Sequence, residues 1–158
     1  MNEASSGNMR PFAHEAPNHC FGCGQANEVG LQLKFLLTQE NSVVCEATVS
    51  DAYEGPPGYL HGGIIATLLD ESMSKAVRAR GLVAMTRKMS VEYLAPVRSC
   101  SAFRLEGHLI RSEGRKHWTA AELKSGEGHV LAKGEGLFLE ISAAQRRTLE
   151  EKAGRGEK

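Results

Sequence analysis

The stretch Tyr59–Val77, YLHGGIIATLLDESMSKAV, decides the fold. Its apolar residues recur every three or four positions, which predicts an amphipathic helix of about five turns. Two glycines, Gly62 and Gly63, stand at the start of this helix. Each glycine costs a helix roughly 1 kcal/mol relative to alanine. We therefore expect another group to approach the helix backbone closely at this point.

Side chains of this helix separate into two main faces when they are placed at about 100° per residue. The apolar face, which we expect to pack against a sheet, contains Ile65, Leu68, Leu69, Ser72 and Ala76. The opposite face is polar and carries Glu71 and Lys75, which are four residues apart in the order that favours a surface ion pair. A surface pair therefore explains Glu71.

Asp70 has no such explanation, because it projects between the two faces beside Ala66, Met73 and Val77. A carboxylate among apolar neighbours is costly unless it is partnered or used in chemistry. Two interpretations stay open from the helix angle alone. Asp70 is a solvated or ion-paired side chain at the helix edge, or it lies at an interface where a second subunit covers the apolar flank.

The glycines at the helix start give a second hint. Free N–H groups there carry the positive end of the helix dipole. Because glycine has no Cβ, an acyl oxygen can come close, so Gly62 and Gly63 form a candidate oxyanion site. The alternative is a tight loop-to-helix turn after Pro56 and Pro57. With Asp70 about two turns later, the glycines suggest a carbonyl-polarising end and a base within one helix.

The rest of the chain is mostly typical of β-strands. Before the helix, strand composition covers Leu31–Leu37 and Ser42–Val49. After it, short breaks typical of an antiparallel meander separate four further segments, which are Met85–Val97, Ser101–Arg111, Lys116–Lys124 and His129–Ile141. The sum is an α+β fold in which one long helix faces a curved antiparallel sheet of about six strands.

Composition sets limits on the function. The 158 residues correspond to one domain, and the 19 Lys and Arg balance the 19 Asp and Glu, which disfavours a nucleic-acid partner. No apolar run approaches the ~18 residues of a membrane span, so we expect no membrane partner. The N-terminus lacks the apolar core of a secretory signal, so we expect a cytoplasmic protein with free thiols.

The chain divides into three parts. We expect a flexible N-terminal segment over residues 1–18, one folded domain over residues 19–141 and a charged tail over residues 142–158. The tail, SAAQRRTLEEKAGRGEK, has at most a short helix at its start and is expected to fray.

Cys20 and Cys23 form a single C-x-x-C. A structural zinc ion needs two more ligands, but Cys45 and Cys100 lie in or beside predicted strands. His14 is a further candidate, so a metal clip stays open.

A redox role for the C-x-x-C has weaker support, because no thioredoxin-like βαβ context surrounds it. The interpretation we favour is a tight turn. Gly22 and Gly24 would allow this turn to lay the N-terminal segment against the body of the domain.

These motifs resemble a known family. The stretch HGGIIATLLDES, residues 61–72, followed by AMTRKMSVEYLAPV, residues 84–97, resembles the hotdog-fold acyl-CoA thioesterases of the PaaI-like branch. CFGCGQANEVGLQLKF, residues 20–35, is similar to the start of one subgroup of that branch. The resemblance covers about residues 20–141. It implies a hotdog fold, an acyl-CoA thioester substrate, and a homodimer or dimer of dimers with active sites between subunits.

The resemblance also implies residue roles. Asp70 would be the nucleophile, or the base that activates water against the thioester carbonyl. The Gly62 N–H would hold the thioester oxygen, while His61 and Gly63 shape the turn against the substrate. Thr86 falls where the branch has a Ser or Thr that helps to place water, and it would come from the opposite subunit. Such chemistry needs no metal and no cofactor.

One position departs from the family pattern. Some relatives have Asn or Gln in the loop ahead of the His-Gly-Gly, where this chain has Glu54 and Gly55. Glu54 either substitutes for that amide at the substrate or is a loop charge, and we favour the loop charge.

Basic residues outside the motifs could meet the phosphates of coenzyme A: Arg87, Lys88, Arg111, Arg115 and Lys116. Two other functions stay open on the same scaffold, namely a non-catalytic acyl-CoA-binding or regulatory protein and an enzyme of other chemistry such as a hydratase. An unpaired acid at Asp70 argues against pure binding, since an apolar acyl chain gains little from it.

Overall fold

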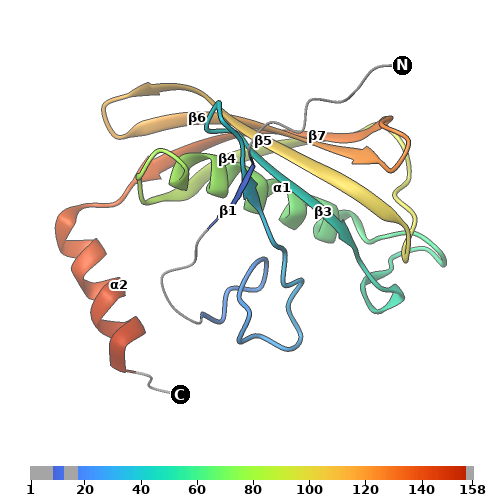
Figure 1. Cartoon of the computed structure of the whole chain (residues 1–158), viewed down its shortest axis with the longest axis horizontal. Helices are drawn as coiled ribbons and strands as arrows, with labels where there is room; N and C mark the ends of the chain where they lie inside the picture. Colours follow the sequence, from blue (N-terminus) through green and yellow to red (C-terminus); the bar gives the residue numbers. More distant parts are fainter. Residues whose placement is uncertain (1–8, 13–17, 156–158) are drawn as a thin grey trace.

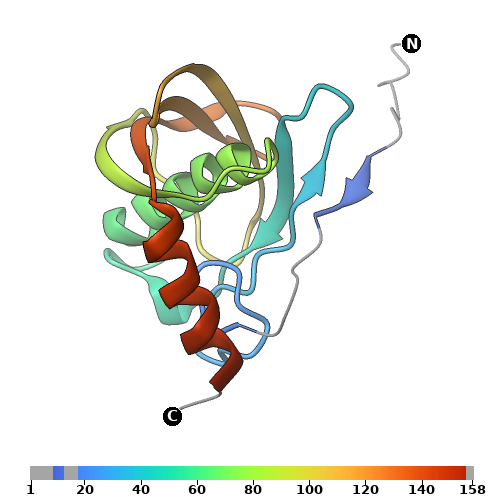
Figure 2. The same ribbon diagram turned by 90° about the vertical axis from the view of Figure 1, so that its left-hand side faces the viewer.

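A curved antiparallel sheet wraps around one long helix in the computed structural model, which describes residues 9–12 and 18–155 (Figures 1 and 2). The seven strands lie in the order β1-β2-β3-β5-β6-β7-β4. They are β1 (Arg10–Pro11), β2 (Leu36–Leu37), β3 (Val43–Thr48), β4 (Ala84–Tyr93), β5 (Ala102–Glu113), β6 (Lys116–Ser125) and β7 (Val130–Glu140). The helices are α1 (Gly62–Arg78) and α2 (Ala143–Arg155), with a short 3-10 turn at Asp51–Tyr53. The predicted α+β architecture is confirmed.

The sheet has one more strand than the sequence predicts, because β1 pairs with β2 at its edge. The rest of the predicted N-terminal segment, residues 1–8 and 13–17, lies outside the described residues, as does His14. The predicted strand Leu31–Leu37 pairs as a strand only at its end. Farther back, its backbone bonds to a loop instead: the Leu31 N–H donates to the Phe21 carbonyl at 2.7 Å.

The predicted apolar face of α1 is confirmed, since Ile65, Leu68, Leu69, Ser72 and Ala76 are all buried. Each fully buried leucine contributes roughly 1.5–3 kcal/mol. The helix lies very close to the sheet at Gly107 of β5, where a Cβ would stand 2.5 Å from the Ser72 carbonyl oxygen. The Ser72 hydroxyl, fully buried, donates to the Leu68 carbonyl at 2.8 Å.

The sheet reaches farther around α1 than the helix angle suggests. Met73 and Val77 are fully buried within this chain, and a Cβ on Gly134 of β7 would contact the Met73 side chain at 3.3 Å. Met73 and Val77 are thus covered by the sheet of this chain, and the prediction that a second subunit covers the flank applies only to its remaining residues. Of the flank, Ala66 and Asp70 remain half-exposed.

Glu71 and Lys75 form the predicted ion pair, with Nζ and Oε1 3.0 Å apart. The pair is not on the surface, however, since Lys75 is only 7% exposed. The loop that contains Cys20 and Cys23 covers it, and Lys75 Nζ donates to Cys23 Sγ at 3.0 Å. This loop is the predicted tight turn, closed by a Gly24 N–H bond to the Cys20 carbonyl at 2.8 Å.

The tail contains a longer helix than predicted. Instead of a short fraying helix, α2 runs from Ala143 to Arg155 and projects from the end of β7 (Figure 1). The Ser142 hydroxyl accepts from the Gln145 N–H, and the Gln145 side chain accepts from the Ser142 N–H. This reciprocal cap satisfies backbone donors at the helix start. No helix in the described ranges has the length and apolar character needed to cross a membrane.

Candidate active site

Asp70 and Thr86 meet at the edge of the sheet. Asp70 lies half-buried on α1, and the Thr86 hydroxyl of β4 donates to Asp70 Oδ1 at 2.7 Å. The pairing of β4 with β7 shifts register between Thr86 and Lys88. Such a bulge bends a strand and re-aims its side chains, and bulges are frequent beside active sites.

Burial raises the pKa of the Asp70 carboxyl above the usual range for aspartate. The hydrogen bond from Thr86 opposes this shift, because it stabilises the charged form, while the negative charge of Glu71 adds to it. A carboxylate with a raised pKa and a fixed orientation has the properties of a general base.

The expectation that Thr86 reaches Asp70 from the opposite subunit is wrong. The hydrogen bond joins two residues of one chain, because β4 follows α1 directly and runs back along it as the edge strand of the sheet.

The start of α1 is capped by His61. Its Nδ1 accepts the Gly63 N–H at 2.9 Å, so this N–H is not free to bind a substrate. The Gly62 N–H has no acceptor within the part of the chain that the structure describes. Gly62 therefore presents the available donor at the positive end of the helix.

Tyr93, at the end of β4, lies beside Gly62 and was missed at the level of sequence. Its hydroxyl donates to the Gly62 carbonyl at 3.0 Å. A Cβ on Gly62 would meet the Tyr93 ring at 3.7 Å, which is an ordinary contact. The contacts within the described chain therefore leave room for a small side chain at position 62.

Gly62 and Asp70 are eight residues apart on one helix, so their backbones are separated by about 12 Å. One thioester carbonyl cannot lie within ~3 Å of an oxyanion donor and also beside a base at that distance. The rise along the helix therefore separates the two candidate groups by more than the length of one carbonyl group.

Glu54 is bound within its own loop. It accepts hydrogen bonds from the Ser99 hydroxyl and from the Gly58 backbone, and these lower the pKa of its carboxyl. Its backbone also forms an isolated bridge with Leu60. These contacts are those of a loop charge, the interpretation that the sequence favours over a substrate contact.

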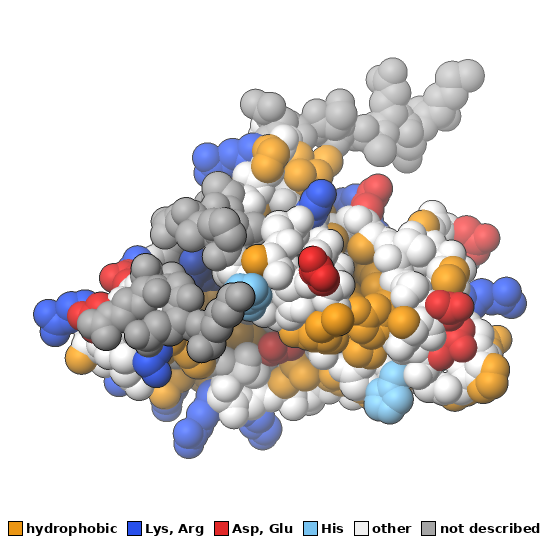
Figure 3. All heavy atoms as spheres, turned by 90° about the horizontal axis from the view of Figure 1, so that it is seen from below, with side chains coloured by type: hydrophobic (Ala, Val, Ile, Leu, Met, Phe, Trp, Pro, Cys, Tyr) orange, Lys and Arg blue, Asp and Glu red, His pale blue; other side chains and the backbone are white. Residues whose placement is uncertain are grey.

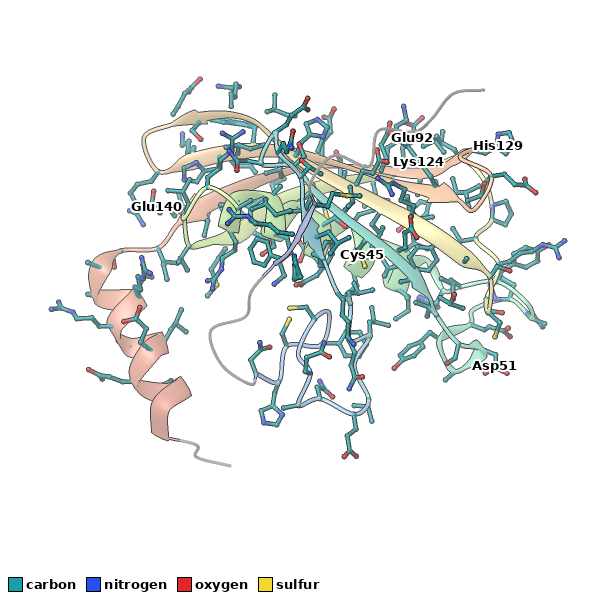
Figure 4. All side chains as sticks on the ribbon, in the orientation of Figure 1. Cys45, Asp51, Glu92, Lys124, His129 and Glu140 are labelled. Carbon is teal, nitrogen blue, oxygen red and sulfur yellow. The ribbon has the colours of Figure 1, made fainter. Side chains whose placement is uncertain are left out.

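A cavity of about 470 Å³ opens beside Thr86, between β4, the end of β7 and α2. Its lining is mixed, with apolar Met85 and Leu139 beside the guanidinium groups of Arg87 and Arg115. Figure 4 places Glu140, another lining residue, where β7 leads to α2. On the face seen in Figure 3, hydrophobic side chains gather in the centre and basic ones are frequent around the α2 end.

The other predicted phosphate ligands are less available. Arg111 lies over the Trp118 ring at 3.5 Å and pairs with Glu113. Arg115 lines the cavity but also donates to the Glu140 carbonyl. Of these basic residues, Arg87 is the one that lines the cavity with no side-chain bond to another described residue.

The sequence profile of the Thioesterase superfamily matches residues 57–132, which contain α1 and the strands β4 to β6. The chain is therefore similar to the thioesterase superfamily over these residues. The match includes the capped start of α1, Asp70 and Thr86.

Curated proteins that this chain resembles agree with that match. An acyl-coenzyme A thioesterase THEM4 from Bos taurus is 28% identical over 118 residues, which are 72% of this chain and 48% of that protein. An acyl-coenzyme A thioesterase THEM5 from Homo sapiens is 33% identical over 110 residues, 68% of this chain and 43% of that protein. The chain thus spans less than half the length of these relatives.

Solved structures support the fold. A thioesterase superfamily protein is 32% identical, with a TM-score of 0.73 over 77% of this chain and 60% of that one. The PaaI protein of E. coli, from the phenylacetic acid degradation operon, has a TM-score of 0.66 over 71% of this chain and 81% of its own, at 18% identity. The hotdog fold implied by the sequence is therefore confirmed.

Proposed function

We propose that this chain is an acyl-CoA thioesterase, which hydrolyses acyl-CoA or a related acyl thioester to a free acid and a thiol. The proposal rests mainly on the Asp70–Thr86 pair. In this pair a half-buried carboxylate lies 2.7 Å from a hydroxyl group at the open edge of the sheet. The names of the curated relatives support the substrate class.

Asp70 acts in this proposal as the base. Thr86 holds Oδ1, and Oδ2 has no partner among the described residues, so it is free to take a proton from water. The water oxygen bonds to the thioester carbonyl carbon, and the carbonyl oxygen becomes an oxyanion. When the oxyanion collapses, the carbon–sulfur bond breaks and the departing thiolate takes the proton from Asp70.

The Gly62 N–H stabilises the oxyanion, and it comes from a second copy of the chain. This division of roles follows from the ~12 Å between Gly62 and Asp70 on one helix. His61 and Gly63 hold the turn that presents the Gly62 N–H. A homodimer is the smallest assembly that completes the site, and a dimer of dimers contains the same unit.

The edge strand β4 supports self-association. It pairs with β7 on one side, and no described strand pairs with its other side. Met85 and Tyr93 on β4, and Leu94 just after it, are 54%, 53% and 48% exposed. A long edge with apolar side chains is a template for pairing with another chain, so we place the dimer interface along β4.

The cavity beside Thr86 is the place for part of the substrate. Met85 and Leu139 offer apolar contact, and Arg87 offers a planar donor for a phosphate group of coenzyme A. The sizes of the acyl groups accepted depend on how two chains close this space.

The test is thiol release from short, long and aromatic acyl-CoAs by the wild-type protein and Asp70→Asn. We expect the wild type to turn over one class and the variant to lose at least about 10²-fold in kcat/KM. If both proteins bind acyl-CoA and neither hydrolyses it, the non-catalytic binding function replaces this proposal.

A further inference from the structure

The turn at residues 20–23 brings two thiols to a carboxylate of α1. Cys20, Cys23 and Glu71 each offer one ligand atom, and these atoms all lie within 4.8 Å of one another. Cys20 Sγ is 3.7 Å from Glu71 Oε2. Cys20 is exposed, whereas Cys23 is buried. The proposed thioester chemistry uses none of these three groups.

The backbone is shaped so that the thiols can approach the carboxylate. A Cβ on Gly22 would stand 2.7 Å from Glu71 Oε2, and one on Gly24 would stand 2.4 Å from the Asn18 carbonyl oxygen. A side chain at position 24 would clash with backbone atoms, and one at position 22 would push the Glu71 carboxylate away, so the pattern C-F-G-C-G keeps the turn and the carboxylate together. The turn thus fixes the positions of both sulfur atoms relative to α1.

Lys75 completes the arrangement from the other side. Its ammonium group lies 3.0 Å from Glu71 Oε1 and donates to Cys23 Sγ at 3.0 Å. Glu71 therefore uses Oε1 for the lysine and turns Oε2 toward Cys20. The net charge of the site with a divalent cation is zero, because two thiolates and one carboxylate balance one ammonium group and the cation. A largely buried site needs such neutrality.

We propose that Cys20, Cys23 and Glu71 bind one zinc ion, with Lys75 as a hydrogen-bond donor to two of the ligands. Tetrahedral zinc, bound at ~2.3 Å to sulfur and ~2.1 Å to oxygen, places these two ligand atoms about 3.6 Å apart. The 3.7 Å between Cys20 Sγ and Glu71 Oε2 fits this geometry. Thiolates also select zinc over magnesium or calcium.

The fourth position of the tetrahedron is open to a water molecule, because Cys20 is exposed. The ion joins the turn to α1 through Glu71. The sequence analysis finds too few ligands for a metal site near Cys20 and Cys23. It does not include Glu71, because this residue is 51 positions from Cys20 along the chain.

The test is zinc binding by the full chain after reduction and removal of metal with a chelator. We expect one equivalent of Zn²⁺ per chain in a competition titration, and a higher Tm with the ion bound. Cys20→Ser should weaken binding at least about 100-fold, since the loss of an outer partner of a ligand already costs 10–100-fold. Cys100→Ser is the matched control, because Cys100 is also exposed and lies outside the cluster, so it should bind as the wild type does.

Co²⁺ used in place of Zn²⁺ reports the ligands directly. The site is supported if Cys100→Ser retains the thiolate-to-cobalt absorption bands and Cys20→Ser loses them. Failure of the reduced wild type to bind Zn²⁺, or equal binding by Cys20→Ser and Cys100→Ser, overturns the proposal. A Cys20–Cys23 disulfide in fresh protein that binds no Zn²⁺ after reduction also overturns it and points to a redox pair.

Discussion

Gly62 and Gly63 differ in what a side chain would meet at each position. At Gly63, a Cβ would stand 3.1 Å from His61 Nδ1, within the helix cap. At Gly62, the nearest group is the Tyr93 ring at 3.7 Å. A side chain at position 63 would therefore press on the helix cap, whereas alanine at position 62 would make an ordinary contact.

Gly62→Ala should therefore lose activity and keep its stability. The new methyl group stands where the thioester oxygen must approach, so we expect kcat/KM to fall about 10²-fold, as for the loss of an oxyanion donor. The Tm should stay the same or rise slightly, because alanine favours a helix by roughly 1 kcal/mol over glycine. Gly63→Ala is the comparison and should lower the Tm. Full activity in Gly62→Ala would contradict the assigned role.

Thr86→Val should move the pH dependence of the reaction. The Thr86 hydrogen bond stabilises the charged form of Asp70 and lowers its pKa, against the raising effects of burial and of Glu71. Valine has the same shape without the donor, so the pKa of Asp70 should rise further. The base form is then lost at a higher pH, and the acid limb of the kcat/KM profile should shift upward. The profile is measured in chelator-treated protein, and an unmoved limb counts against Asp70 as the base.

At the scale of elements, the sequence predicts what depends on local periodicity. The buried face of α1 and the four strands after it can be predicted because the spacing of apolar residues within each element indicates its type. The burial of Lys75 does not, because the turn that covers it comes from Cys20–Cys23, far away in the chain. The partner of Thr86 is equally non-local, since it depends on how β4 runs along α1 and on a bulge in that strand.

The separation of Gly62 and Asp70 could have been predicted from the sequence alone. Eight residues of helix span about 12 Å whatever surrounds them. That length, combined with the chemistry of one carbonyl group, favours the proposed division of the site between two chains. The burial of Met73 could not be predicted in this way, because it depends on how far the sheet curves around α1.

Gly107→Ala tests the contact between helix and sheet. A Cβ at this position of β5 would lie 2.5 Å from the Ser72 carbonyl oxygen, and a backbone atom cannot move without shifting α1. We expect a loss of about 1–3 kcal/mol in the free energy of unfolding, as for overpacked cores. Gly126→Ala is the control, because its Cβ would meet only the Ala102 carbonyl oxygen, at 3.5 Å. Urea unfolding of both variants gives the comparison, and equal stability would show that the helix lies farther from the sheet.

At the scale of the whole molecule, the proposed function divides each active site between two chains. The end of α1 at Gly62 lacks a base, and the Asp70–Thr86 pair lacks an oxyanion donor within reach. In the proposed dimer, a two-fold axis would bring the Gly62 of each chain to the Asp70 of its partner, since a symmetric dimer repeats every contact. The proposed interface along β4 lies next to both halves, because Thr86 and Tyr93 are residues of that strand.

Mixing two inactive variants tests this division of the site. Gly62→Ala and Asp70→Asn each inactivate both active sites of their own homodimer. In a mixed dimer, the Asp70 of one chain meets the Gly62 of the other, so one site of the two is intact. Random reassembly from equal amounts makes half of the dimers mixed, and we expect about one quarter of the wild-type activity to return. If the site were complete within one chain, mixing would restore nothing, because no chain of the mixture would hold both intact residues. Dimer dissociation and reassembly are followed by native mass spectrometry of the same samples, so that a failure to exchange chains is not mistaken for a failure to complement.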